Sequence, residues 1–156
     1  MTICIVDTSV LCNILPVPGM DQQRNQVMRD LERYLRDDAH LLLPVAVVLE
    51  TGRHIAHLSD GSERRITAER LRDVVTTDSS TGPEKPFELV GRLNPARLEA
   101  HIADFPDLAQ SKVTLTDALL IEQFELQLAA NEAHRVLIWS LDGHLQGHGQ
   151  AARFNP

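Results

Sequence analysis

The sequence contains few residues of the kinds that mark secreted, membrane-spanning or highly basic proteins. Its 156 residues include two cysteines, one tryptophan and one tyrosine, and aromatic residues make up only 4%. No apolar run approaches the length of a membrane span, and no basic leader with a cleavage site opens the chain. The sequence has 15 Lys and Arg residues and 22 Asp and Glu residues, which gives a net charge of −7. This negative net charge disfavours binding of nucleic acid through overall charge attraction alone. We therefore expect a cytoplasmic protein.

The two cysteines also lie in apolar surroundings. Cys4 falls within the first apolar run and Cys12 shortly after it. A buried free thiol behaves as a small apolar group, and disulfides are unusual in a reducing compartment. Without further cysteines or paired Cys-His spacing, a zinc site is not expected.

Short apolar runs alternate with segments of helical periodicity. This order predicts an α/β fold, a three-layer α/β/α sandwich with a mostly parallel central sheet, in a single domain over residues 1–156. The expected strands are residues 2–6, 40–43, 87–90 and 135–140. The expected helices are residues 21–37, 44–57, 62–75 with Ser62 as N-cap, a helix that starts at Pro95 and ends at Pro106, and residues 115–132; residues 76–86 are expected to form a loop.

Four acidic residues are candidates for a common site, and three of them stand where expected strands end or helices begin. Asp7 follows the first strand, Asp142 follows the last expected strand, and Asp117 lies in the first turn of the helix at 115–132. Glu50 lies inside the helix at 44–57. Functional groups of an open parallel sheet gather beyond the carboxyl ends of its strands, so three of these four positions agree with one site. Carboxylates that converge need a positive charge among them, and a divalent metal is the usual source.

Each acid also has a local explanation. Asp7 suits the N-cap of the segment after the first strand, and Asp117 fits a capping box with Thr114. Asp142 and the following glycine form a common turn dipeptide. Glu50 shares a helical face with cationic and imidazole side chains, namely Arg53, His54 and His57. Individually, therefore, the four acids leave both interpretations open.

The acids and the residues around them resemble the PIN-domain family of metal-dependent ribonucleases, over residues 2–156. The resemblance is carried by DTSVL from Asp7, the apolar run that ends in Glu50, TDALL around Asp117 and IWSLD ending in Asp142. Smaller features agree with it: the hydroxyl residues Thr8 and Ser9 beside the first acid, Ser140 two residues before the last, and the ending Phe154-Asn155-Pro156, which is similar to that of compact toxin-type members.

The resemblance implies a metal-dependent endoribonuclease. Asp7, Glu50, Asp117 and Asp142 would hold one or two Mg²⁺ or Mn²⁺ ions, and Ser9 or Thr8 would position a water or a phosphate oxygen. Within the family, the compact single domain is similar to toxins of the VapC type, which typically dimerise and are inhibited by a small antitoxin protein. A housekeeping RNA-processing nuclease and a catalytically silent PIN-like interaction module are the alternatives.

The chain departs from the family pattern at several places. His144 stands where many members have another Asp, and 25 residues separate Asp117 from Asp142, more than in compact members. Residues 60–110 match no family pattern. Five of the 15 cationic residues lie between residues 53 and 72, where they would contact an RNA backbone or simply solvate a helix. A phosphatase of the haloacid dehalogenase type also begins with a strand that ends in Asp, but it requires a second Asp where this chain has Ser9.

Overall fold

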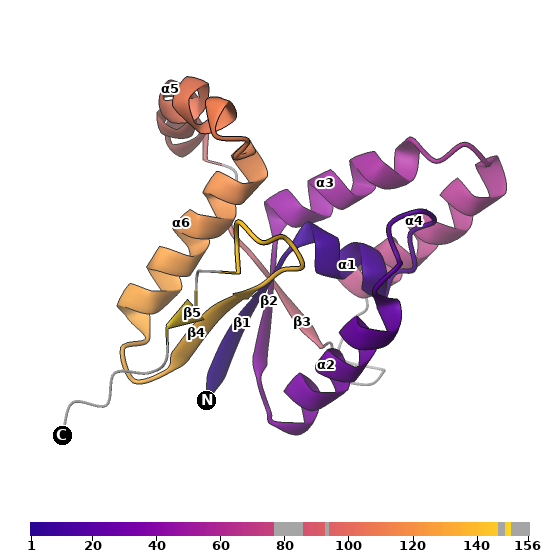
Figure 1. The fold of residues 1–156 in the computed structure, drawn as a ribbon, viewed down its shortest axis with the longest axis horizontal. Helices are drawn as coiled ribbons and strands as arrows, with labels where there is room; N and C mark the ends of the chain where they lie inside the picture. The colour runs from indigo at the N-terminus through magenta and orange to yellow at the C-terminus, as the bar shows by residue number, and fades with distance from the viewer. Residues whose placement is uncertain (77–85, 93, 147–148, 151–156) are drawn as a thin grey trace.

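A parallel sheet forms the centre of the molecule. The computed structural model describes residues 1–76, 86–92, 94–146 and the backbone of residues 149–150. The four parallel strands have the order β3-β2-β1-β4, and a short β5 pairs antiparallel with β4 at one edge (Figure 1). Their bounds are β1 Thr2–Val6, β2 His40–Pro44, β3 Phe87–Val90, β4 Arg135–Trp139 and β5 Gly149–Gln150.

Helices cover both sides of the sheet, which confirms the predicted three-layer α/β/α class. They are α1 Thr8–Ile14, α2 Arg24–Arg36, α3 Val45–Ala56, α4 Gly61–Thr76, α5 Pro95–Gln110 and α6 Leu115–Ala130. Helix α6 packs against β1 and β4, whereas α3 contacts β2 and α4 contacts β3. Figure 1 shows α6 on one side of the sheet and α1, α2 and α4 on the other. Helix α5 stands at the N-terminal end of α6, away from the sheet.

The central strand β1 is buried almost completely. It pairs in register with β2 and β4, and Cys4, Ile5 and Val6 have no exposed surface. A strand with neighbours at both edges and helices over its faces needs an unbroken apolar sequence, as Ile3 to Val6 provides. Trp139 at the end of β4 packs edge-on against Tyr34 of α2, with ring centroids 5.0 Å apart. The core therefore fixes the carboxyl ends of β1 and β4 side by side.

The prediction that Pro106 ends a helix is wrong, because Pro106 lies inside α5. Proline disfavours a helix interior, yet the backbone signals that stop this helix come later. Lys112 adopts a left-handed conformation with φ of 60°. The amide of Val113 donates to the carbonyl of Leu108 at 2.9 Å, and that of Lys112 to Ala109 at 3.0 Å. This is the Schellman pattern, and it ends α5 after Gln110.

Two further predicted helix starts need correction. Helix α4 begins at Gly61, and the side chain of Asp60, rather than Ser62, accepts the amide of Glu63 at 2.9 Å. Pro44 is the last residue of β2 and the N-cap of α3, so it precedes that helix instead of forming its first turn. Most of the predicted loop at 76–86 and the terminal Phe154-Asn155-Pro156 lie outside the described residues.

The predicted state of the cysteines is confirmed, since Cys4 and Cys12 are both buried free thiols. Of the helices in the described ranges, none has the length and apolar composition needed to cross a membrane.

Candidate active site at the carboxyl edge of the sheet

Asp7 is the buried centre of the candidate site, with 5% of its surface exposed. Its amide donates to the carbonyl of Trp139 at 3.1 Å, which extends the pairing of β1 with β4 by one residue. Its side chain is the N-cap of α1, as the local interpretation predicts, and accepts the amide of Ser9 at 3.3 Å. The residue thus lies at the meeting point of two strand ends and a helix start.

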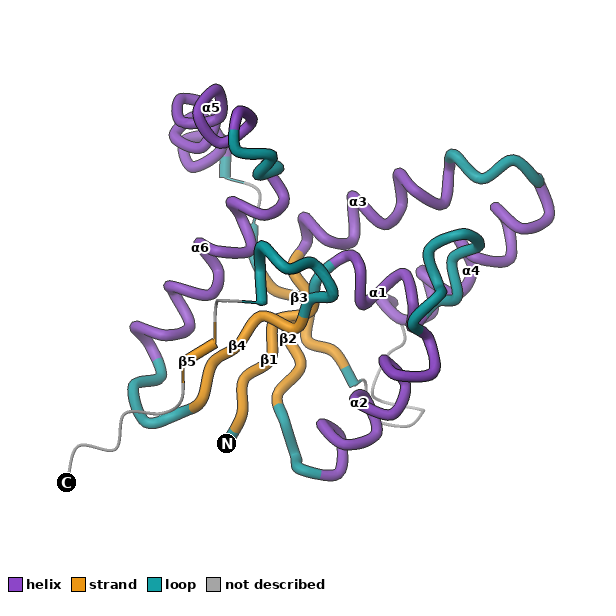
Figure 2. Tube along the Cα trace, in the orientation of Figure 1, coloured by secondary structure: helices purple, strands orange, loops and turns teal. Residues whose placement is uncertain are grey.

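Two serine hydroxyls converge on one oxygen of Asp7. The Oγ of Ser9 donates to Oδ2 at 2.6 Å and the Oγ of Ser140 at 2.8 Å. Each hydroxyl also accepts a backbone amide, Ser9 from Leu141 at 3.0 Å and Ser140 from Asp142 at 2.9 Å. We call this arrangement of Asp7, Ser9 and Ser140 the serine clamp. It ties the loop after β4 to the start of α1, and Figure 2 shows this loop passing in front of the strand ends toward α1.

Glu50 is joined to the same region by α1. The Oγ1 of Thr8 donates to its Oε2 at 3.4 Å, and the Nε2 of His54 lies 3.7 Å from its Oε1. The second contact is the i,i+4 pairing that the helical face predicts. Helix α1 packs against α3, which brings Thr8 at the start of α1 next to Glu50. The hydroxyl of Thr8 thereby ties Glu50 to the residue after Asp7, and the hydroxyl of Ser140 ties the backbone amide of Asp142 to the Asp7 carboxylate.

Asp117 lies outside this network of hydrogen bonds. Its Oδ2 accepts the amide of Thr114 at 2.9 Å, and its own amide donates to Thr114 Oγ1 at 3.0 Å, which is the predicted capping box. Helix α6 nevertheless packs against both α3 and β4, so Asp117 starts a helix that adjoins the other acids. Asp142 also has its predicted turn role, because its Oδ1 accepts the amide of the exposed His144 at 3.1 Å.

Burial dominates the electrostatics of Asp7. Removal from water raises the pKa of its carboxyl above the usual 3.8, although the hydrogen bonds from Ser9 and Ser140 oppose this. Burial, together with the nearby charges of Asp7 and Glu50, likewise raises the pKa of the Cys12 thiol to about 11. Cys12 therefore lies close to both acids. Its spacing of four residues from Thr8 on α1 is the sequence signal that places it there.

The chemistry of these residues fits a hard divalent cation. Carboxylate oxygens are the ligands that Mg²⁺ and Mn²⁺ prefer, and a cation would offset the burial of Asp7. Within the described part of the chain, Asp7 pairs with no cationic side chain, and no three His, Cys, Asp or Glu side chains are gathered closely enough to hold a metal ion. Joint coordination therefore requires the exposed Asp142 and the partly exposed Glu50 and Asp117 to turn their side chains toward Asp7.

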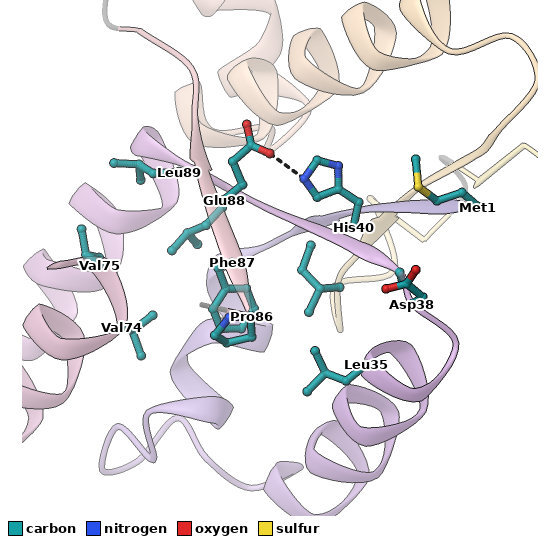
Figure 3. Close-up of a pocket in the computed structure, with 13 residues that line it drawn as sticks. Met1, Leu35, Asp38, His40, Val74, Val75, Pro86, Phe87, Glu88 and Leu89 are labelled. Carbon is teal, nitrogen blue, oxygen red and sulfur yellow. Dashed lines mark ion pairs between the residues drawn. The ribbon is translucent and has the colours of Figure 1, made fainter. Parts of the chain in front are cut away.

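A larger hollow lies elsewhere and lacks this chemistry. It has a volume of about 1030 Å³ and surrounds the first residues of β2 and β3 (Figure 3). Its wall is mostly apolar, including Leu35, Val75 and Phe87, and its polar rim carries the ion pair of His40 with Glu88. The strands are parallel, so this hollow is at the edge of the sheet opposite to Asp7 and Asp142. None of the four candidate acids lines it.

The chain matches no protein-family model, no curated protein and no solved structure among those with which it was compared.

Proposed function

We propose that this protein is a metal-dependent endoribonuclease similar to the PIN-domain family. The observation that carries the proposal is the serine clamp, which holds a buried carboxylate at the carboxyl edge of a parallel sheet and fixes the backbone of a second acid, Asp142, beside it. A third acid, Glu50, is tied to the residue after Asp7 through Thr8. This edge is where α/β proteins of this topology build their sites.

The four acids Asp7, Glu50, Asp117 and Asp142 would hold one or two Mg²⁺ or Mn²⁺ ions. When bound, such an ion supplies an activated water and stabilises charge on the phosphate. The protein's own contribution is positional. The hydroxyls of Ser9 and Ser140 both donate to Asp7, so they hold its carboxylate in one orientation. Thr8 does the same for Glu50. This supports a positioning role for Ser9, in place of the expected contact with water or phosphate.

The proposed biological role is that of a toxin in a toxin–antitoxin pair. In this role, which the family resemblance implies, the protein would be a cytoplasmic homodimer that cleaves RNA and is inhibited by a small antitoxin protein. A housekeeping RNA-processing nuclease would use the same residues.

A catalytically silent PIN-like module is a second candidate, and one observation favours it. Each acid has a local role in the fold: Asp7 and Asp117 cap helices, Asp142 closes a turn, and Glu50 contacts His54. A protein that had lost catalysis would retain acids for such roles.

Cleavage assays of Asp142→Asn separate the two candidates. Asparagine accepts the amide of His144 as aspartate does, so the turn is preserved, while one metal ligand loses its charge. We expect the wild type to cleave single-stranded RNA in Mn²⁺ and the variant to be at least about 100-fold slower. Asp37→Asn, at the exposed C-cap of α2, is the matched control and should retain full activity. A silent module would show no metal-dependent cleavage in any of the three proteins.

A further inference from the structure

A second, smaller pocket opens at the same edge of the sheet as the acids. Its volume is about 40 Å³, and it lies between the end of β3, the first turn of α3 and one face of α6. Two arginines contribute to its wall, Arg92 just after β3 and Arg97 in the first turn of α5. These two side chains bring positive charge to a chain whose net charge is −7.

The backbone at the end of β3 is shaped to place Arg92 there. Gly91 has a φ of +84°, a conformation that side-chain-bearing residues rarely adopt. The chain turns at this glycine, directly after Val90 has completed the pairing of β3 with β2. Arg92 therefore leaves the sheet at its carboxyl edge, the edge at which Asp7 follows β1 and Asp142 follows β4.

Helix α3 connects the pocket to the candidate active site. Ala46 lines the pocket, and Glu50 lies four residues further along the same helix. Residues at this spacing share one helical face, with their Cβ atoms about 6 Å apart. A polynucleotide with one phosphate near Glu50 could thus reach the pocket with a neighbouring phosphate.

The charges within the pocket leave a positive excess. The Nη2 of Arg97 lies 2.8 Å from the Oε1 of Glu122, and the Nε2 of His101 lies 3.4 Å from its Oε2. Arg92 has no ion pair with an acidic residue in the described ranges. The pocket wall thus carries two guanidinium groups, those of Arg92 and Arg97, and one carboxylate, that of Glu122. Guanidinium groups bind phosphate oxygens through two parallel hydrogen bonds, a geometry that an ammonium group cannot provide.

We propose that Arg92 and Arg97 form a subsite for a backbone phosphate of single-stranded RNA, next to the nucleotide that is cleaved. This inference rests on the proposed nuclease function and assigns part of its substrate binding to a particular place. Arg92, just after β3, and Arg97, in the first turn of α5, would then bind the same phosphate group. The same phosphate chemistry would accept single-stranded DNA.

The ion pair of Arg97 with Glu122 also braces α5 against α6, so loss of Arg97 affects the fold as well as binding. Arg92 has no such partner among the described residues, and its replacement separates the two effects. Arg36, which is exposed at the last residue of α2, provides a matched control because α2 leads into the opposite edge of the sheet.

The test measures binding of a fluorescent single-stranded oligoribonucleotide by anisotropy, in the Asp7→Asn background so that the RNA stays intact. Arg92→Gln is expected to weaken binding roughly fivefold, and Arg36→Gln to leave it unchanged. The dependence of log affinity on log salt concentration should become shallower by about 0.7 when one phosphate contact to a single strand is lost. In the cleaving protein, Arg92→Gln should raise KM and leave kcat nearly unchanged.

The outcomes distinguish the subsite from the function on which it rests. Unchanged affinity and salt dependence in Arg92→Gln, in a protein that binds and cleaves RNA, would overturn the subsite alone. Equal losses in Arg92→Gln and Arg36→Gln would also overturn it, because only net charge would then matter. A protein that neither binds nor cleaves the oligonucleotide removes the nuclease function and the subsite together.

Discussion

The carboxylate of Asp7 shows how strongly burial acts on a single residue. Three hydrogen bonds end on its Oδ2, from the Ser9 amide and from the hydroxyls of Ser9 and Ser140, yet its pKa is raised because only 5% of the residue remains exposed. Hydrogen bonds to neutral donors do not replace the hydration of a charge. In the metal-free protein, ionised Asp7 therefore destabilises the fold.

Replacement of Asp7 by asparagine should stabilise the protein in metal-free buffer. Asparagine accepts the same hydrogen bonds and caps α1 equally well, but it carries no charge. At neutral pH we expect the variant to be more stable by about 1 kcal/mol, which is about 2 to 4 °C in melting temperature for a chain of this size.

The raised pKa of Asp7 also determines how the stability of the protein changes with pH. The folded pKa of Asp7 exceeds 3.8, so the folded protein binds the proton more tightly than the unfolded chain. The wild type therefore loses stability as the pH rises from about 3.8 through the folded pKa, and the variant does not. Melting curves from pH 3.5 to 8 should show a difference that grows over this window and then stays constant. A difference that is the same at every pH would show that ionisation of Asp7 is not its cause.

Sequence patterns predict the positions of the four acids but not what surrounds them. The contact of Ser140 with Asp7 joins residues 133 apart in the chain, and no local pattern contains it. The place of Cys12 near Asp7 and Glu50 depends on how α1 packs against α3. Local roles were easier to predict, because the capping box of Thr114 with Asp117 involves residues only three apart.

At the scale of elements, the start of α6 combines a structural and a proposed catalytic role, and the two can be separated. Thr114 caps the helix with its hydroxyl, whereas Asp117 accepts the amide of Thr114. Thr114→Ala should lower stability by about 1 kcal/mol through loss of the cap and leave cleavage intact. Asp117→Asn should keep the fold, since the amide oxygen accepts the same bond, and nearly abolish cleavage.

Thermal melting and RNA cleavage, both measured on both variants, decide the matter. Full cleavage activity in Asp117→Asn would return that residue to a purely structural role at the helix start.

The ends of the helices were the least predictable features of the elements. Proline is a helix breaker, so Pro106 predicted a helix end, yet α5 continues through it and ends where Lys112 adopts a left-handed backbone conformation. A lysine side chain gives no sequence signal for that conformation. Asp60 and Ser62 are both good capping residues two positions apart; the predicted N-cap was Ser62, whereas it is Asp60 that accepts the amide of Glu63.

At the scale of the whole molecule, alternation of apolar strands with helices was enough to predict the parallel sheet and its layers. It did not predict that β5 adds an antiparallel edge, since that strand is only two residues long. Nor did it predict that α5 would stand off the sheet, with Leu98 and Ile102 exposed. Helical periodicity shows that one face is apolar but not which partner covers it.

Binding of a divalent metal ion should raise the thermal stability of the whole molecule. The protein has a net charge of −7 and a buried carboxylate without a cationic partner among the described residues, so Mn²⁺ that binds only the folded state should stabilise it. At a concentration 100 times the dissociation constant, the gain is about 2.7 kcal/mol, or roughly 5 to 10 °C in melting temperature. Asp7→Asn should lose most of this gain. The variant should therefore melt above the wild type in EDTA and below it in saturating Mn²⁺. Equal shifts in both proteins would place the bound metal away from Asp7.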